Sequence, residues 1–349
     1  MLFGSPDRVF LWPGGPRQST LERWYTEGMP RDVNLSDMLG LDRMEGLPID
    51  FMPVPRFEQV VLEDFEDKKI WIDELGAKRL DFKTQATPGF VTRTWLEFPV
   101  KSRADFERMK ERFDPRSPAR LPVWWDEKKQ YYRERDFALG LTFPSMFWRV
   151  RDWVGLEGLC EMFYDNPALV RDMMEFVVDF DIEVMRRALP DVAPDYVFFN
   201  EDMAYKGASL ISPKMVREFM LPGYKRLASF LKECEVPVLM MDCDGYIGEL
   251  IPIWLEAGLN ATWPIEIAAG NDPILYRKQY GKRLAMGGAI DKRELARDKA
   301  AVEREIMSKA PWLLKRGGYV PTCDHGIPPD VPYENYLYMI ELIKRVGGA

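Results

Sequence analysis

Short apolar segments that end in polar residues recur through the second half of the chain. They begin near residues 195, 237, 260, 284 and 318, and an earlier one covers 137–142. A stretch with helical spacing follows each segment. Strands that alternate with helices in this way are typical of a parallel sheet built from βα units. We therefore expect an α/β fold in which eight such units close into a TIM-type (β/α)8 barrel.

The beginning of the chain follows a different pattern. Residues 57–63 and 69–74 alternate apolar and polar positions, which predicts a pair of strands, and 75–80 would continue this antiparallel excursion. The charged segment 102–113 predicts a surface helix with Ser102 as its N-cap. This part of the chain is therefore expected to differ in architecture from the rest.

These patterns suggest a division near residue 115. We predict that residues 1–115 form an N-terminal elaboration of helices and antiparallel strands, packed on a barrel of residues 116–349. The alternative is an open doubly wound sheet. No Gly-x-Gly-x-x-Gly follows any of the expected strands, so a dinucleotide site of that fold is not indicated.

The composition narrows the functional classes. Of the 349 residues, 46% are hydrophobic and 30% charged, which is typical of a chain that buries a large core. The net charge of -8 argues against a nucleic-acid groove, and no long uncharged apolar run predicts a membrane span. Four cysteines do not suggest a disulfide framework, and the first residues do not resemble a signal peptide. We expect a cytoplasmic protein.

Ionisable side chains follow two of the expected strands. Asp242 and Asp244 come after the segment at 237, and Cys323 and His325, the only histidine, come after the last one. Residues two apart on an extended strand point the same way, so each pair can face one site. One pair with a donor from another strand gives three ligands and an open position, the pattern of a catalytic zinc site. The alternative for His325 is a hydrogen-bonding turn residue.

The same edge of the sheet supplies further candidates. Glu201 follows the segment at 195, and an enclosed carboxyl there could have its pKa raised toward a proton donor's role. Phe199 and Trp263 could line an apolar pocket for an aromatic substrate, although packing is the plainer role for both. Asp291 could bind substrate or cap the next helix. Asp202 and Glu266 are also expected at this edge.

The C-terminal half resembles the uroporphyrinogen decarboxylase superfamily, which also contains corrinoid and coenzyme M methyltransferases. The resemblance is carried by Asp244-Gly245, by residues 284–291 with Leu295, and by residues 325–332 with Glu334-Asn335. It covers roughly residues 195 to 345. The resemblance implies a TIM-type barrel, in agreement with the strand pattern.

The methyltransferases of this superfamily bind zinc through a His-x-Cys pair and a later cysteine. In this chain those positions fall at Asp242 and Asp244, and at or near His325, with Cys323 as the substitute ligand. Two carboxylates and an imidazole can still hold zinc, and they favour an oxygen-bearing substrate. The resemblance thus implies a zinc-dependent methyltransferase. It would move a methyl group between a small methoxylated or methylated substrate and a corrinoid on a partner protein.

Two alternatives stay open. One is a uroporphyrinogen decarboxylase-like decarboxylase of a tetrapyrrole or another carboxylated substrate, which the likeness of 325–327 to the decarboxylases' Gly-His-Gly favours. Against a tetrapyrrole, residues 18–28 have one arginine between glutamates where the decarboxylases have Arg-Gln-Ala-Gly-Arg. The other alternative is a barrel that binds a ligand without chemistry. A homodimer is among the assemblies that the resemblance implies.

Overall fold

A computed structural model describes the chain except for residues 2, 5, 85–90 and 349. It divides into two compact units, and unit 1 is built from segments that are distant in the sequence. Unit 1 comprises Met1–Glu45, Asp202–Leu210 and Pro237–Ala349, and unit 2 comprises Gly46–Glu201 and Ile211–Val236. The boundary expected near residue 115 falls inside unit 2, and the division into elaboration and barrel stays a prediction.

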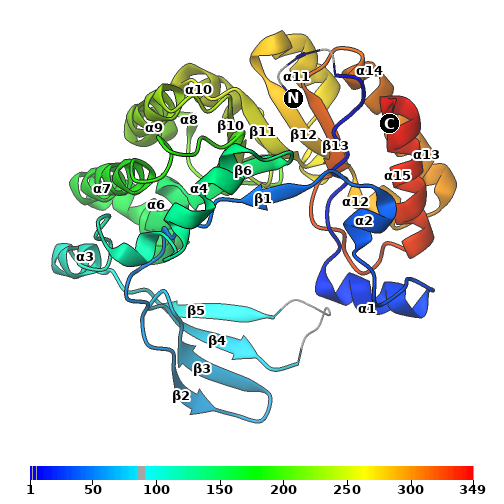
Figure 1. Cartoon of the computed structure of the whole chain (residues 1–349). Coiled ribbons are helices and arrows are strands. Elements are labelled where there is room, and N and C mark those ends of the chain that lie inside the picture. The colour runs from blue at the N-terminus through cyan, green and yellow to red at the C-terminus, as the bar shows by residue number, and fades with distance from the viewer. Residues whose placement is uncertain (2, 5, 85–90, 349) are drawn as a thin grey trace. The chain divides into compact units, whose positions relative to one another are not determined.

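A parallel sheet forms the centre of unit 1 (Figure 1). Its strands are, in order, β10 (Val238–Asp242), β11 (Ala261–Ile265), β12 (Ala285–Ile290) and β13 (Tyr319–Cys323). These four strands were expected from the sequence. Asp242 pairs with Trp263, and Ile290 pairs with Cys323, so the carboxyl ends of all four strands meet at one edge.

Helices follow the strands of unit 1. They are α10 (Ile251–Ala257), α11 (Pro273–Tyr280), α12 (Lys292–Leu295), α13 (Lys299–Met307), α14 (Ala310–Leu314) and α15 (Tyr333–Gly347). Their ends carry the expected signals. Asp272 caps α11 by accepting from the Ile274 and Leu275 amides, and Pro273 takes the first helical position. Gly258 ends α10 in the left-handed conformation.

The beginning of the chain packs against its end within unit 1. The Cys323 amide donates to the Pro13 carbonyl (3.0 Å), and the Ile327 amide donates to the Gly15 carbonyl (2.9 Å). Two helices follow this segment, α1 (Gln18–Thr26) and α2 (Leu35–Leu39), and the Trp24 indole donates to the Val331 carbonyl. Unit 1 is completed by the short strand pair β8 (Ala204–Tyr205) and β9 (Ala208–Ser209).

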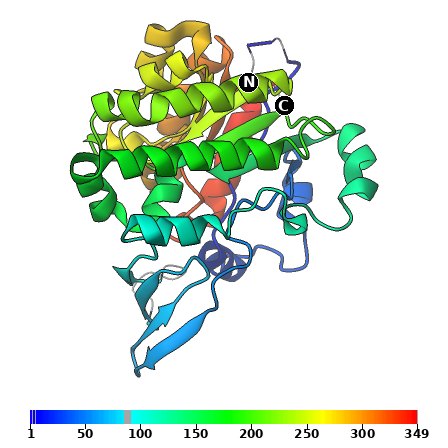
Figure 2. The same cartoon turned by 90° about the vertical axis from the view of Figure 1, so that its left-hand side faces the viewer.

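Unit 2 contains the parallel pair β6 (Ala138–Pro144) and β7 (Tyr196–Asn200), as expected. Its helices are α3 (Arg103–Lys110), α4 (Trp125–Arg133), α5 (Met146–Val154), α6 (Leu156–Asp165), α7 (Pro167–Met185), α8 (Pro213–Met215) and α9 (Leu221–Glu233), with a π-helix, η2 (Val216–Met220), between the last two. Ser102 caps α3 by accepting from the Asp105 amide, which confirms the prediction. Figure 2 shows α7 and α9 running alongside each other.

Unit 2 also holds a four-stranded antiparallel sheet (Figure 1). Its strands are β2 (Val60–Asp64), β3 (Lys68–Ile72), β4 (Lys78–Phe82) and β5 (Arg93–Glu97), paired in this order. The first three match the expected excursion. A short strand, β1 (Met44–Gly46), lies where the chain passes from unit 1 to unit 2.

The α/β class is confirmed by the parallel strand pairs and their intervening helices. Within the described parts of units 1 and 2, parallel pairing involves β6 and β7 in one unit and β10–β13 in the other. The closed eight-stranded barrel stays a prediction. No helix in the described ranges is long and apolar enough to cross a membrane.

Candidate active site

His325 lies just beyond β13 and contacts three side chains of unit 1. Its Nε2 is 3.2 Å from Oδ1 of Asp244, and its Nδ1 is 2.8 Å from Nζ of Lys292 and 3.4 Å from Oδ1 of Asp324. The His325 side chain is 18% exposed, and that of Asp244 is 45% exposed. The imidazole therefore stands at a solvent-accessible edge and can exchange protons with carboxyl groups on either side.

Further carboxyl groups surround these residues. We use the name His325 cluster for the side chains of Asp202, Asp242, Asp244, Glu266, Lys292, Asp324 and His325, all in unit 1. Asp202 accepts a hydrogen bond from the Asp244 amide (2.9 Å). Glu266 accepts one from the Gly245 amide (2.9 Å) and lies 3.4 Å from Nζ of Lys292. The cluster thus combines five carboxyl groups with two basic side chains.

The turn after β10 connects members of the cluster by hydrogen bonds, and its conformation requires a glycine at position 245. This residue has φ +85°, and a Cβ atom here would come within 2.6 Å of the Ala204 backbone. A side chain would therefore push the turn away from residues 202–205, while glycine lets the Asp244 and Gly245 amides reach Asp202 and Glu266. Asp202 itself has a positive φ of 41°, so local backbone strain accompanies this contact.

Asp242, the last residue of β10, is the carboxyl most strongly affected by its surroundings. Burial raises its pKa, the nearby Asp202 and Asp244 raise it further, and His325 opposes them, with a result of about 8. Asp242 consequently keeps its proton at neutral pH. A protonated carboxyl beside an imidazole is the arrangement of a proton donor.

The protonation of His325 reflects opposing influences. Burial lowers its pKa, while the hydrogen bonds to Asp244 and Asp324 raise it to about 9, and the Lys292 ammonium acts against them. An ammonium group 2.8 Å away can only donate, so Nδ1 accepts from Lys292 when the imidazole is neutral. A second proton on Nδ1 requires Lys292 to turn toward Glu266 or Asp324 (3.4 and 3.5 Å).

The predicted metal ligands do not converge as a metal site requires. Asp242, Asp244 and His325 belong to the same cluster, but in the described part of the chain no three His, Cys, Asp or Glu side chains form a group that could hold a metal ion. Cys323 is fully buried, and burial raises its thiol pKa to about 12, whereas a metal binds the thiolate. In this arrangement the donors do not fit zinc, and zinc binding stays a prediction.

Trp263 lies beside the cluster, because it pairs with Asp242 across β10 and β11. Its ring packs against that of Trp12, with 6.1 Å between the two ring centroids. Trp12 and Gly14 in turn line a pocket of about 400 Å³ in unit 1, with Leu21 and Tyr25 among the other lining residues. A Cβ atom on Gly14 would lie 3.5 Å from the His325 carbonyl oxygen, so this pocket borders the segment that carries the imidazole.

Glu201 is fully buried in unit 2. Its Oε2 accepts from the Phe147 and Trp148 amides (2.8 and 3.0 Å), and its Oε1 accepts from the Tyr224 hydroxyl (2.6 Å). Burial raises its pKa to about 7, against the lowering effect of the hydrogen bonds. This agrees with the predicted raised pKa, but the donors join β7 to the first turn of α5 and to α9. The contacts are those of a residue that positions these elements.

Two predicted substrate-binding residues are buried. Phe199 is fully buried, with its ring 5.0 Å from that of Phe143, so it offers no exposed surface to a substrate. Asp291 caps α12 by accepting from the Arg293 amide, and its carboxylate also pairs with the Arg293 guanidinium (2.7 Å). The capping alternative for Asp291 is therefore confirmed.

Lys292 and Asp324 were not predicted. Asp324 stands between Cys323 and His325 in the sequence and could have been noticed there. Lys292 follows Asp291 at the start of α12, and no spacing rule distinguishes it from other lysines.

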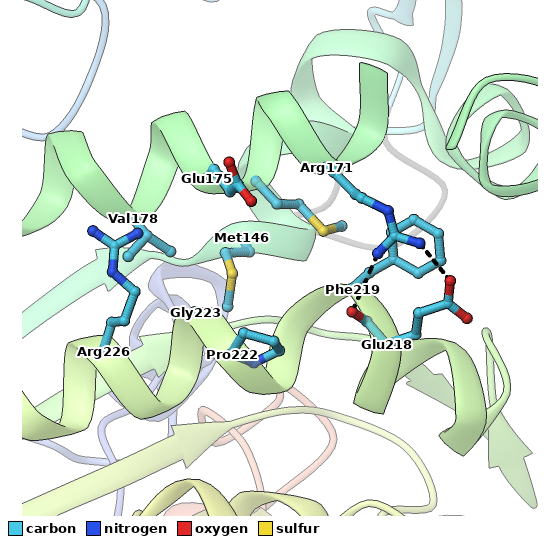
Figure 3. Close-up of a pocket in the computed structure, with 10 residues that line it drawn as sticks. Met146, Arg171, Glu175, Val178, Glu218, Phe219, Pro222, Gly223 and Arg226 are labelled. Atoms are coloured by element: carbon cyan, nitrogen blue, oxygen red, sulfur yellow. Dashed lines mark hydrogen bonds and ion pairs between the residues drawn. The ribbon is translucent and has the colours of Figure 1, made fainter. Parts of the chain in front are cut away.

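A separate pocket of about 150 Å³ lies in unit 2 (Figure 3). It lies between α7 and the η2–α9 segment, with Met146, Val178 and Phe219 in its lining. Arg171 donates to the carboxylate of Glu218, which satisfies the charges on this side. The predicted site residues are absent from the residues that line it, and we assign it no chemistry.

Comparison with known proteins places this site in a family. The family model described as uroporphyrinogen decarboxylase (URO-D) matches residues 146–346. The uroporphyrinogen decarboxylase of Pelobacter propionicus is 25% identical over 299 residues, which cover 82% of this chain and 80% of that protein. The uroporphyrinogen decarboxylase of Geobacter sulfurreducens is 24% identical over 314 residues, covering 86% and 83%.

A solved structure shares the fold. The methyltransferase from Methanosarcina mazei superposes with a TM-score of 0.61 at 15% identity, over 99% of this chain and 96% of that one. The family match includes β7, β10–β13 and every member of the His325 cluster. Because that match spans more than half of its residues, the chain belongs to the uroporphyrinogen decarboxylase (URO-D) family.

Proposed function

We propose that the chain is a decarboxylase that acts on a small carboxylated compound, with the His325 cluster as its acid and base. One observation carries the proposal: His325 contacts Asp244 and Lys292 within a cluster where Asp242 keeps its proton at neutral pH. The names of two relatives support the reaction type, since both are called uroporphyrinogen decarboxylase.

The cluster suits the proton transfer that decarboxylation needs. The reaction breaks the bond between the carboxylate carbon and the substrate, releases CO2 and leaves the bonding electron pair on the substrate. A proton must then take the place of the lost carboxylate. Asp242 or doubly protonated His325 donates it, and water restores the proton to the cluster. The substrate itself must stabilise the electron pair, as an electron-poor or protonated ring can.

The charges define the substrate class. The cluster consists of five carboxyl groups and two basic side chains. Because the carboxyl groups outnumber the basic ones, the cluster repels a molecule with many carboxylates. A single carboxylate can pair with Lys292. The pocket beside Trp12 and Tyr25, which borders the His325 segment, suits an aromatic ring. We therefore infer a ring compound with one or two carboxylates as substrate, and disfavour the octacarboxylate tetrapyrrole.

The test is CO2 release from a panel of aromatic mono- and dicarboxylic acids, with uroporphyrinogen included. Asp242→Asn and His325→Gln should each reduce kcat by about 100-fold or more, in line with the loss of a general acid. Asp126→Asn is the matched control, since that side chain is 87% exposed and lies in unit 2. Full activity in either cluster variant would overturn the mechanism, and preference for uroporphyrinogen would overturn the substrate class.

A second proposal is methyl transfer between a methoxylated or methylated substrate and a corrinoid on a partner protein, with zinc bound by Asp242, Asp244 and His325. The observation that favours it is the crowding of Asp242 by Asp202 and Asp244, because a cation would relieve this repulsion. The arrangement of the donors argues against this proposal, because these side chains do not converge on a point that a metal could occupy.

Elemental analysis separates the two proposals. The methyltransferase predicts about one zinc per chain, retained after dialysis against a mild chelator and lost in Asp242→Ala and His325→Ala, together with turnover of methoxylated compounds by added cobalt(I) corrinoid. The decarboxylase predicts full CO2 release from chelated, metal-free protein. A preparation with neither zinc nor turnover would favour a ligand-binding role.

A further inference from the structure

The carboxyl end of β12 has an unusual backbone conformation. Gly288 has φ +99° and Ala289 has φ +66°, in the left-handed region that glycine adopts freely and other residues adopt at a cost. Such a conformation persists only where the surrounding structure holds it. Ile290 and Asp291 follow directly, and α12 begins at Lys292. The contacts that hold Ala289 therefore determine where α12 starts.

Two charged side chains bind the backbone on either side of Ile290. Nζ of Lys309 donates to the Ala289 carbonyl (2.9 Å), and Oε1 of Glu305 accepts from the Asp291 amide (2.7 Å). Lys309 and Glu305 also form an ion pair with each other, and their side chains are 9% and 11% exposed. We call these two residues the Glu305–Lys309 pair. It belongs to unit 1, with Glu305 on α13 and Lys309 directly before α14 (Figure 1).

The attraction within the ion pair does not by itself explain its place in the fold. Burying two opposite charges costs about as much as their attraction returns, and apolar side chains of similar volume often stabilise a protein equally well. The Glu305–Lys309 pair differs from apolar side chains in what it binds. An ammonium group only donates and a carboxylate only accepts, so each matches one backbone group beside Ile290. The distinct effect of the pair is therefore to fix the backbone between Ala289 and Asp291.

This stretch of backbone leads into the His325 cluster. Lys292 is the next residue after Asp291, and its Nζ lies 2.8 Å from Nδ1 of His325. The Ile290 carbonyl accepts from the Asp324 amide (2.9 Å), so the same stretch also holds the residue before the histidine. A shift of the Asp291 backbone by about 1 Å would take the ammonium beyond hydrogen-bonding distance of the ring. The geometry of the cluster thus depends on the backbone that the Glu305–Lys309 pair binds.

We propose that the Glu305–Lys309 pair positions the active site: by holding the backbone on either side of Ile290, it places the Lys292 ammonium against His325 and against a substrate carboxylate. The part that concerns the carboxylate rests on the proposed function. The part that concerns His325 rests on the contacts alone. Glu305 and Lys309 are positioning residues, which act through the backbone and take no part in proton transfer.

The test replaces both residues of the pair together in the full-length protein. Glu305→Leu/Lys309→Met removes both charges, so no buried charge is left unpaired, and the variant should unfold at a temperature close to that of the wild type. Benzoate, which carries one carboxylate on an aromatic ring, should bind about tenfold more weakly to this variant in titration calorimetry, and likewise to Lys292→Met. Because the changes act through one contact, combining them should weaken binding no further than Lys292→Met alone.

A second measurement needs no ligand. The ¹⁵N signal of Nδ1, read in the neutral imidazole of the only histidine, should shift in Glu305→Leu/Lys309→Met in the same direction as in Lys292→Met. Glu305→Gln can still accept from the Asp291 amide and should keep the signal and benzoate binding close to those of the wild type. Glu303→Gln is the matched control on α13, because its side chain is 47% exposed, and it should also change neither.

These measurements separate the positioning role from the substrate class. A wild type that does not bind benzoate would contradict the substrate class of the proposed function, and the Nδ1 signal would then decide the positioning role by itself. An unchanged Nδ1 signal in the double variant, or benzoate binding equal to that of the wild type, would overturn the positioning role. A further loss of binding on adding Lys292→Met would show that the pair does not act through Lys292.

Discussion

The ammonium of Lys292 lies 2.8 Å from Nδ1 of His325, while Nε2 of the same ring faces Asp244 at 3.2 Å. The imidazole thus stands between a cation and an anion. The carboxylate favours a second proton on the ring and the ammonium opposes it, so the proton affinity of His325 depends on both neighbours.

Replacement of Lys292 by methionine should raise the pKa of His325 above about 9, because the opposing positive charge is removed. Since His325 is the only histidine, its ring ¹⁵N signals can be followed by NMR across a pH series without assignment. Lys206→Met, at an exposed lysine of unit 1, should leave the pKa unchanged. A lower pKa in Lys292→Met would contradict the contact.

Asp242→Asn should change how stability depends on pH. The pKa of Asp242 is about 8 in the folded protein and near 3.8 when unfolded, so the folded state binds this proton more tightly. The stability that the proton contributes is complete below about pH 4 and is lost as the pH rises to 8. The asparagine variant lacks this loss. As the pH rises from 4 to 8, the free energy of unfolding of the variant minus that of the wild type should increase by up to about 1.4 kcal/mol per pH unit.

Urea unfolding at several pH values between 4 and 9 measures this difference. Above pH 8 the difference between Asp242→Asn and wild type should become constant. Asp126→Asn, at an exposed carboxylate, should follow the wild type throughout. A difference that does not grow with rising pH would show that Asp242 is ionised in the folded protein.

Tyr224→Phe should destabilise unit 2. The Tyr224 hydroxyl is one of the donors to the fully buried Glu201 carboxyl, and loss of a hydrogen bond to a buried charged group costs about 1–3 kcal/mol. The pKa of Glu201 should also rise above about 7. Tyr164→Phe is the matched control, because its side chain is 76% exposed. Equal unfolding midpoints in urea for the two variants would rule out this role for Tyr224.

Asp291→Ala should lower stability by about 0.5–2 kcal/mol through loss of the α12 cap, with kcat retained. Asp291→Asn keeps a capping oxygen and should recover most of that stability. Thermal unfolding and CO2 release, measured on the same samples, check both parts. A large loss of kcat in the asparagine variant would return Asp291 to the substrate-binding residues.

Much of the strand order could be predicted from local patterns. β10–β13 are apolar runs that end in polar residues, and a parallel sheet must bring their carboxyl ends to one edge. This is why Asp242, Asp244 and His325 could be grouped from sequence alone. The N-cap at Ser102 could be predicted for a similar reason, since a serine before a helical segment has few other local roles.

Features that depend on distant contacts could not be predicted. Lys292 belongs to the cluster because α12 follows β12, whose last residue, Ile290, pairs with Cys323 at the end of β13. The residues next to Lys292 in the sequence do not indicate this pairing. Asp242 and Asp244 follow the zinc ligands' spacing, but side-chain convergence depends on the turn at Gly245 and its contact with residues 202–205. The discontinuous make-up of unit 1 could not be predicted either, because its first and last segments associate across more than two hundred residues.

The make-up of unit 1 determines when its site can form during synthesis. Residues 1–45 leave the ribosome well before residues 323–327, yet the Pro13 and Gly15 carbonyls receive their hydrogen bonds from Cys323 and Ile327. Both segments of unit 2 have left the ribosome once residue 236 has emerged. The Pro13 and Gly15 carbonyls must stay without these partners while more than two hundred residues are translated, so a nascent chain that stalls before β13 contains every segment of unit 2 but no His325 cluster.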